Sequence, residues 1–453
     1  MSSNDNNSSN VTQRAVGGKK TTTTTTTTRT LSGSDTPTVS TTKVTTTTSS
    51  SSGSGKTKTN ASSGTSNGCL SVLKGLVAVV AIVGAVTFPF LKETATDLGL
   101  FLGPIVKVNT DLCRPVFSLE SCEDVHIHRP SGLAIAACGR FETRKINGWF
   151  PPLGHLNHSA DPLSFQDHIV LYNPEDGKHE VMDIENFPEG ADRVFHGFDI
   201  YERSERELTL FFINHRRTGS VVEVIDYYVG ETTMKYVQTI QHDLISTPND
   251  IVALGLRSFY VSNDHKYLSG PMRVIENNLR RAWSNVIYYS PEQTLVAYEG
   301  VSSANGMTAN HDKSIIYVSA CHGAGIHVME PRDDHTLRER DFIKLDFYAD
   351  NPSLDPVTGA IFLTGHTQPL KLLAGFNVPG EPMISPFKVI KISNNTGSDQ
   401  FYGKKYKIDE VLVDDGTDMS GATTAAVDRE RNVMLIGTLD KRGLWQCTIP
   451  KDA

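Results

Sequence analysis

The chain has 453 residues, of which 38% are hydrophobic, and a formal net charge of −8. Its first 67 residues carry more Lys and Arg than Asp and Glu, so the remainder is more acidic than the whole. An acidic body argues against a nucleic acid partner and is compatible with cations. The length allows either two or three average domains or one large all-β unit.

The amino-terminal 68 residues are dominated by Ser, Thr, Asn and Gly, with a run of threonines at 21–28. A segment with so few apolar residues cannot bury enough surface to offset the entropy lost on folding. We therefore expect residues 1–68 to be a disordered tail, either a simple spacer or a segment regulated by phosphorylation.

An apolar run follows the tail, in which Lys74 is the only charge before Lys92. About 20 apolar residues suffice to cross a bilayer. The run lies too far from Met1 for an ordinary cleaved signal peptide, so we expect a signal-anchor helix over 69–92. A buried core helix is the alternative. Lysines before the run favour a cytosolic tail and a lumenal or extracellular body, which is the type II single-pass topology.

After a linker or amphipathic segment at 93–110, the pattern changes to short β-branched and aromatic runs that end in polar clusters or glycine turns. Six such runs begin near residues 168, 208, 258, 314, 360 and 432. The middle spacings suit a four-stranded blade. We therefore predict an all-β fold, a six-bladed β-propeller over 111–453, because a β-sandwich seldom needs six such units.

Polar residues recur at blade-like intervals. They are Glu123-Asp124, Asn249-Asp250, Asn305 and Asp350-Asn351. The inner strands of a propeller converge on its axis, so such residues can meet around one channel. They supply only oxygen, which calcium prefers, and without a cation their carboxylates would repel one another. The alternative is that each pair only makes a turn.

Two of the fifteen histidines stand out, namely His196 in RVFHGFDIY and His215 in FFINHRRTG. A neutral imidazole can take a proton from water near pH 7, and a second one can relay it. Either could instead be a hydrogen-bonded turn histidine. The sequence contains no EF-hand loop, zinc spacing or P-loop.

These residues stand in longer matches that run through most of 110–450, among them SCEDVHIHRPSGLA, TPNDIVALG, SFYVSNDHKY, SANGM and DNPSLDPVTGAIFLTGH. Together the matches resemble the serum paraoxonase/arylesterase family of calcium-dependent lactonases. The resemblance implies a six-bladed propeller with two central calcium ions.

The resemblance also implies roles for individual residues. The catalytic calcium would be held by Glu123, Asn249, Asn305, Asp350 and Asn351. The structural calcium would be held by Asp124, Asp250 and the backbone carbonyl of Phe198. His196 and His215 match the histidine dyad, and Cys113 and Cys447 match the end-closing disulfide.

We expect Cys122 to be a free or packed thiol, and the sequons at Asn157 and Asn394 are compatible with glycosylation. Three departures from the family pattern are Gly365 in place of a free cysteine before His366, a longer insertion at 145–167, and the Ser/Thr-rich tail.

The expected function is calcium-dependent hydrolysis of small lactones and aryl esters by a membrane-anchored propeller. One alternative is a non-catalytic, calcium-stabilised propeller that binds a protein or lipid partner, which would need no histidine pair. Another is a strictosidine-synthase-like propeller enzyme, which would lack the full set of Glu, Asn and Asp residues.

Overall fold

The computed structural model describes residues 11–16, 19–30, 38–48, 66–161, 165–378 and 383–451. These residues fall into two compact units, Met1–Ile82 and Val83–Ala453.

The first unit contains an antiparallel sheet in the order β1 (Val11–Val16), β2 (Lys19–Thr30) and β3 (Thr38–Thr48). This sheet differs from the expectation of a wholly disordered tail. Threonine is β-branched and favours extended backbone, which accounts for strands in the Thr-rich runs. The rest of the tail lies outside the described residues.

Helix α1 (Ser66–Asp97) covers the predicted anchor and extends beyond it on both sides. Within it, Leu76–Asp97 is long and apolar enough to cross a membrane, with a mean hydropathy of 1.9. That property rests on length and composition alone. The helix is therefore a candidate membrane span.

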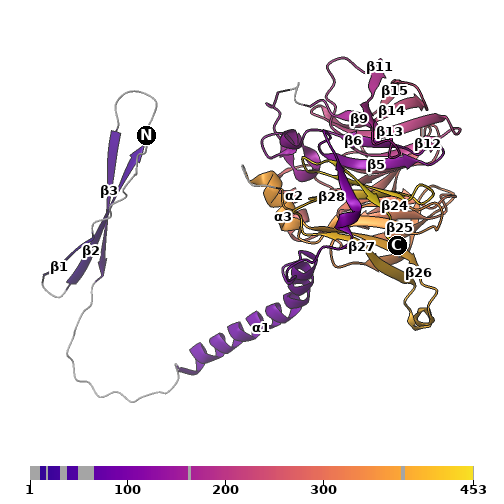
Figure 1. Ribbon diagram of the computed structural model, residues 1–453. Coiled ribbons are helices and arrows are strands. Elements are labelled where there is room, and N and C mark those ends of the chain that lie inside the picture. Colours follow the sequence, from indigo (N-terminus) through magenta and orange to yellow (C-terminus); the bar gives the residue numbers. More distant parts are fainter. Residues whose placement is uncertain are drawn as a thin grey trace. The chain divides into compact units, whose positions relative to one another are not determined.

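The second unit carries six four-stranded antiparallel sheets that form the blades of a β-propeller, one of them with a fifth strand at its edge (Figure 1). Blade 1 contains β5 (Cys122–His128), β6 (Leu133–Cys138), β9 (His168–Tyr172) and β10 (His179–Val181). Blade 2 contains β12 (Phe195–Glu202), β13 (Glu207–Arg216), β14 (Gly219–Tyr228), β15 (Thr233–Ile240) and the edge strand β11 (Asp183–Glu185). Blade 3 contains β16 (Pro248–Ala253), β17 (Phe259–Asn263), β18 (Ser284–Tyr289) and β19 (Thr294–Val301).

Blade 4 contains β20 (Ala304–Ala309), β21 (Ile316–Ala320), β22 (Gly325–Pro331) and β23 (Leu337–Lys344). Blade 5 contains β24 (Tyr348–Leu354), β25 (Ile361–His366), β26 (Phe387–Asn394) and β27 (Tyr406–Asp414). Blade 6 contains β28 (Ala422–Asp428), β29 (Val433–Thr438), β30 (Leu444–Thr448) and β4 (Cys113–Val116). The first strand of each blade contacts those of its two neighbours, which closes the ring of inner strands.

Shorter elements connect strands within blades 1, 3 and 5 or precede β4. They are helices α2 (Gly270–Asn278) and α3 (Pro369–Asn377), strands β7 (Trp149–Phe150) and β8 (His155–Leu156), and 3-10 turns at Thr110–Leu112, Phe141–Arg144, Pro151–Leu153 and Ser398–Tyr402. Figure 1 labels α2 and α3 on the same side of the propeller.

The all-β prediction and the blade number are confirmed. Five of the six predicted runs are second strands, in blades 2 to 6, and the run at 168 is the third strand of blade 1. The second strand of that blade is β6, LAIAAC. Its alanines are small and have weak β-propensity, so the sequence pattern misses it.

The ring closes by pairing strands from the two ends of the propeller sequence. β4 lies antiparallel to β30, with Cys113 opposite Cys447, and a disulfide joins these two cysteines as the resemblance implies. A second disulfide links Cys122 to Cys138, so the expectation that Cys122 is a free or packed thiol is wrong. These cysteines are register partners on β5 and β6, a short hairpin that brings them together.

Candidate active site

All six inner strands break their pairing register close to their first residue. The breaks lie at Cys122/Asp124, Phe195/Phe198, Pro248/Ile251, Ala304/Met307, Ala349/Pro352 and Ala422/Thr424. Such a bulge leaves residues unpaired and re-aims their side chains. The residues inside the breaks are Glu123, His196, Gly197, Asn249, Asp250, Asn305, Gly306, Asp350, Asn351 and Thr423.

The local sequence suits these breaks because Asn and Asp side chains bond to nearby backbone amides. The Oδ1 atom of Asn305 accepts from the N–H of Gly306 at 2.7 Å, and the Oδ1 atom of Asp250 accepts from Ile251 at 2.7 Å. A Cβ atom at Gly306 would lie 2.3 Å from the Oδ1 atom of Asn351. Only glycine therefore lets the neighbouring strand approach so closely.

A cavity of about 130 Å³ opens above these breaks. Its lining includes five of the predicted site residues: Glu123, His196, Asn249, Asn305 and Asp350. Asn351 reaches the same place, since its Nδ2 atom donates to the Oε1 atom of Glu123 at 2.9 Å. The structure thus brings together all five residues expected around the catalytic calcium.

The three residues expected around the structural calcium do not line this cavity. The Oδ2 atom of Asp124 accepts from the backbone N–H of Phe198 at 3.2 Å, and the Oδ2 atom of Asp250 accepts from Met307 at 2.6 Å. Both carboxylates are buried. Asp124 and Phe198 are therefore neighbours, as expected.

The donor set fits a hard divalent cation. Three buried oxygens of this set have no hydrogen-bond partner among the described residues: Oε2 of Glu123, Oδ1 of Asn249 and Oδ1 of Asn351. Burial, and then the charges of Asp124 and Asp350, hold the pKa of Glu123 well above its usual range. In the described part of the chain no cluster of His, Cys, Asp and Glu alone could hold a metal, so the amide oxygens are essential to this set.

Without a cation, the propeller should lose stability as pH rises. Burial raises the pKa values of Glu123, Asp250 and Asp350, so the folded state favours their protonated forms. A group with a raised folded pKa stabilises the fold at low pH, and this contribution is lost as pH rises through that pKa. We expect chelator-treated protein to melt at a higher temperature near pH 5 than near pH 7.5, and added calcium to remove most of this difference. A melting temperature that does not change with pH in chelator would contradict the interpretation that these buried carboxylates destabilise the fold when they are ionised without a cation.

His196 and His215 form a hydrogen-bonded pair. The Nδ1 atom of His196 lies 3.1 Å from the Nε2 atom of His215, whose Nδ1 atom lies 2.9 Å from the Oγ atom of Ser220. Burial lowers the pKa of His196 well below its usual value and lowers that of His215 to about 3. Both rings are therefore neutral near pH 7. The Nε2 atom of His196 lies 3.6 Å from the Oε1 atom of Glu123, which places it beside the oxygen set.

Three residues of the 145–167 insertion, Phe150, Pro152 and Leu153, line the cavity, a role that the sequence did not reveal. The indole Nε1 atom of Trp149 donates to the backbone carbonyl of His215 at 2.6 Å. The ring of Phe150 lies edge-on to His196 at 5.3 Å and lines the cavity. The guanidinium of the buried Arg144 lies over the ring of Phe150, 4.7 Å from its centroid. The only signal in the sequence was the unusual length of this segment.

Gly365 is explained by a close approach. A Cβ atom there would lie 2.3 Å from the carbonyl oxygen of Tyr348, so no cysteine fits without a shift of β24. Instead Cys321, a free thiol, lines the cavity. His366 lines it too, with its Nε2 atom 3.0 Å from the Oδ2 atom of Asp350.

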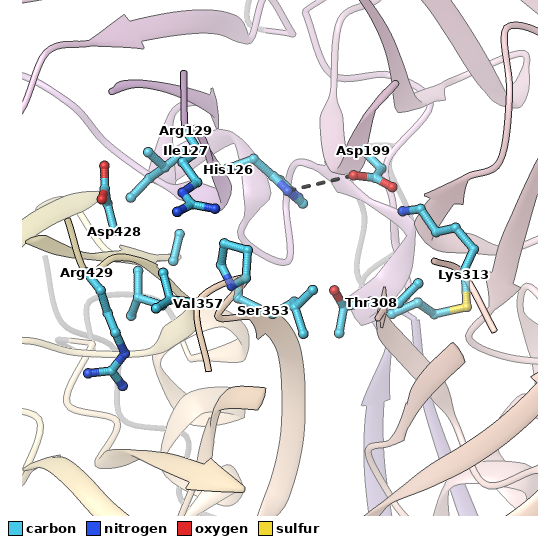
Figure 2. Close-up of a pocket in the computed structure, with 16 residues that line it drawn as sticks. His126, Ile127, Arg129, Asp199, Thr308, Lys313, Ser353, Val357, Asp428 and Arg429 are labelled. Atoms are coloured by element: carbon cyan, nitrogen blue, oxygen red, sulfur yellow. Dashed lines mark ion pairs between the residues drawn. The ribbon is translucent and has the colours of Figure 1, made fainter. Parts of the chain in front are cut away.

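The opposite ends of the inner strands surround a separate cavity of about 180 Å³. Figure 2 shows His126 and Asp199 there, with the Nδ1 atom of His126 3.9 Å from the Oδ1 atom of Asp199. Both arginines that line this cavity form ion pairs, Arg129 with Glu430 and Arg429 with Asp355. None of the predicted catalytic or metal-binding residues lines this cavity.

The arylesterase family model matches residues 108–449. Serum paraoxonase/lactonase 3 of Oryctolagus cuniculus is 32% identical over 71% of this chain and 84% of its own length. The same protein of Homo sapiens is 30% identical over 75% of this chain and 89% of its own. Serum paraoxonase/arylesterase 2 of Rattus norvegicus is 32% identical over 75% of this chain and 90% of its own length. The chain therefore belongs to the arylesterase family.

Proposed function

We propose that this protein is a calcium-dependent hydrolase of lactones and aryl esters, anchored in a membrane by α1. The observation that carries the proposal is that the oxygen-donor set and a neutral histidine share one buried cavity. Lactonase and arylesterase in the names of the relatives support the same reaction class.

Two sites for calcium are proposed. Glu123, Asn249, Asn305, Asp350 and Asn351 would hold the ion nearer the cavity, and Asp124, Asp250 and the carbonyl of Phe198 would hold the deeper one. When bound, the upper ion would supply Lewis acidity that favours charge on a substrate carbonyl oxygen. The apolar wall made by Phe150, Leu153 and the α3 residues Leu372 and Leu373 would hold the organic part of the substrate.

The histidine pair would supply the base. With the Nδ1–H group of His196 donating to His215, and that of His215 donating to Ser220, the Nε2 atom of His196 is left free to accept a proton from water. His215 holds this tautomer and can share the charge that forms. Trp149 holds the backbone of His215, and Phe150 packs against both rings. A propeller that used calcium only for stability would not need this pair.

The proposal is tested by assaying the purified protein on a panel of lactones and aryl esters. Hydrolysis above the rate in buffer supports it. If folded, calcium-loaded protein hydrolyses no member of the panel, the binding-propeller alternative takes its place.

His196→Gln should lower turnover by about 10²–10⁴-fold, because it removes the base while keeping a similar volume. Calcium affinity and melting temperature should stay close to wild type, since His196 is not among the proposed ligands. Esters with good leaving groups should lose less. His327→Gln is a matched control, because His327 is also buried but bonds to Glu339 on β23, outside the cavity. Equal losses in the two variants would contradict the assignment of His196.

We further propose the type II topology, with the propeller in the lumen or outside the cell. Protease added to intact microsomes should then remove only the tail that precedes α1. Digestion of the propeller in intact microsomes would contradict this topology and place the propeller on the cytosolic side. Of the two sequons, Asn394 is exposed, whereas the Nδ2 atom of Asn157 donates to the carbonyl of Asn147. Asn394 is therefore the better glycosylation site.

A further inference from the structure

The last turn of α1 ends on a buried ionic contact with the propeller. The side chain of Asp97 is 3% exposed, and its Oδ2 atom accepts from the Nη2 atom of Arg280 at 2.5 Å and the Nζ atom of Lys344 at 3.0 Å. The Nη1 atom of Arg280 also donates to the Oγ1 atom of Thr94 at 3.3 Å. A buried carboxylate is tolerable only when it is paired in this way. The helix terminus is therefore held at a specific place on the propeller.

The same two cations hold a segment of the cavity wall. The Nε atom of Arg280 donates to the carbonyl of His322 at 2.6 Å, and the Nζ atom of Lys344 donates to that of Gly323 at 3.0 Å. His322 and its neighbour Cys321 both line the cavity. Arg280 thus connects Asp97 directly to the backbone of the cavity wall.

The chain just after α1 contacts a second wall segment. Gly99 has a φ of +66°, and a Cβ atom there would lie 2.0 Å from the carbonyl oxygen of Thr367. Thr367 follows His366, which lines the cavity and binds Asp350. The end of α1 and the residues after it therefore touch blades 4 and 5 where both border the cavity.

We propose that the carboxyl-terminal end of α1 supports the cavity wall from behind, and that Asp97 positions the 321–324 segment through Arg280. The anchor helix then shapes the pocket as well as attaching the protein to a membrane. Asp97 touches neither the cavity nor the proposed ligands, so it is a positioning residue.

The thiol of Cys321 reports on this segment without any need for catalysis. In full-length protein carrying Cys69→Ser, Cys321 is the only cysteine outside a disulfide. Asp97→Asn should speed alkylation of Cys321 by N-ethylmaleimide about tenfold, because Arg280 and Lys344, which hold the 321–324 segment, lose their buried charged partner. The KM for phenyl acetate should rise more than kcat falls, while Asp97→Glu, which keeps the charge, should largely restore both measurements.

Glu93→Gln is the matched control. Glu93 also pairs with Lys344, at 2.9 Å, but its side chain is 55% exposed, and the charge of Arg280 acts on it more weakly than that of Lys344. It should leave the alkylation rate within about twofold of wild type. Wild-type alkylation and KM in Asp97→Asn, or an equal effect of Glu93→Gln, would overturn the proposal.

If Asp97→Asn does not fold, the double variant Asp97→Asn/Arg280→Gln removes the unpaired charge and should show the same faster alkylation. Slow alkylation in that double variant would also overturn the proposal. If wild type hydrolyses nothing but the alkylation rates follow the prediction, the proposed function fails while this inference stands.

Discussion

Asp350→Ala is expected to lower hydrolysis of lactones and aryl esters alike by at least about 10²–10³-fold, the loss found when one group that stabilises a developing oxyanion is removed. Asp350 contributes a proposed calcium ligand and also binds His366, so both the ion and one wall of the cavity depend on it. The loss should be the same for every substrate, because each would depend on the same ion. Initial rates with one lactone and one aryl ester, in excess calcium, measure it.

Asp428→Asn is the control for this variant. Asp428 is a buried carboxylate at the opposite end of an inner strand, where it bonds to Arg431 and lines the separate cavity. Turnover should stay near wild type. Full turnover in Asp350→Ala would remove calcium from the proposed reaction.

Asp124→Ala should lower the free energy of unfolding in calcium by about 3–5 kcal/mol, the range for removing one partner of a buried charged interaction. The Asp124 carboxylate accepts from the N–H groups of Val125 and Phe198, and both would be left without an acceptor. Binding energy of the deeper ion, which stabilises only the folded state, would be lost as well.

The rise in melting temperature on adding calcium separates these two causes. Asp199→Ala also removes an acceptor of two backbone N–H groups, those of Ile200 and Ala253, but no proposed ligand. The calcium-dependent rise should shrink in Asp124→Ala and persist in Asp199→Ala. A full calcium response in Asp124→Ala would show that this residue does not hold the deeper ion.

The sequence predicted the propeller because hydrophobic runs recur at the length of one blade, and that regularity is local to each blade. Blade-like spacing also indicated that Asn249, Asn305 and Asp350 would meet. The bulges explain why spacing was informative. Each of these inner strands breaks its register close to its first residue, so residues one blade apart in sequence occupy equivalent positions in neighbouring blades.

Other features depend on contacts that no local pattern encodes. The Cys122–Cys138 disulfide needs the β5–β6 hairpin, whose second strand is rich in alanine. Trp149 reaches His215 across blades, from an insertion with no regular pattern. Asp97 meets Arg280 across 183 positions of sequence, and neither residue belongs to a recognisable motif.

The central claim is hydrolysis at a calcium site, and the most direct measurement follows bound calcium and turnover together while the protein is stripped with chelator and then reloaded. We expect two calcium ions per chain. Turnover should be lost when the less tightly held ion leaves and restored when it returns. Full turnover in protein shown to contain no calcium would contradict the proposed calcium-dependent hydrolysis.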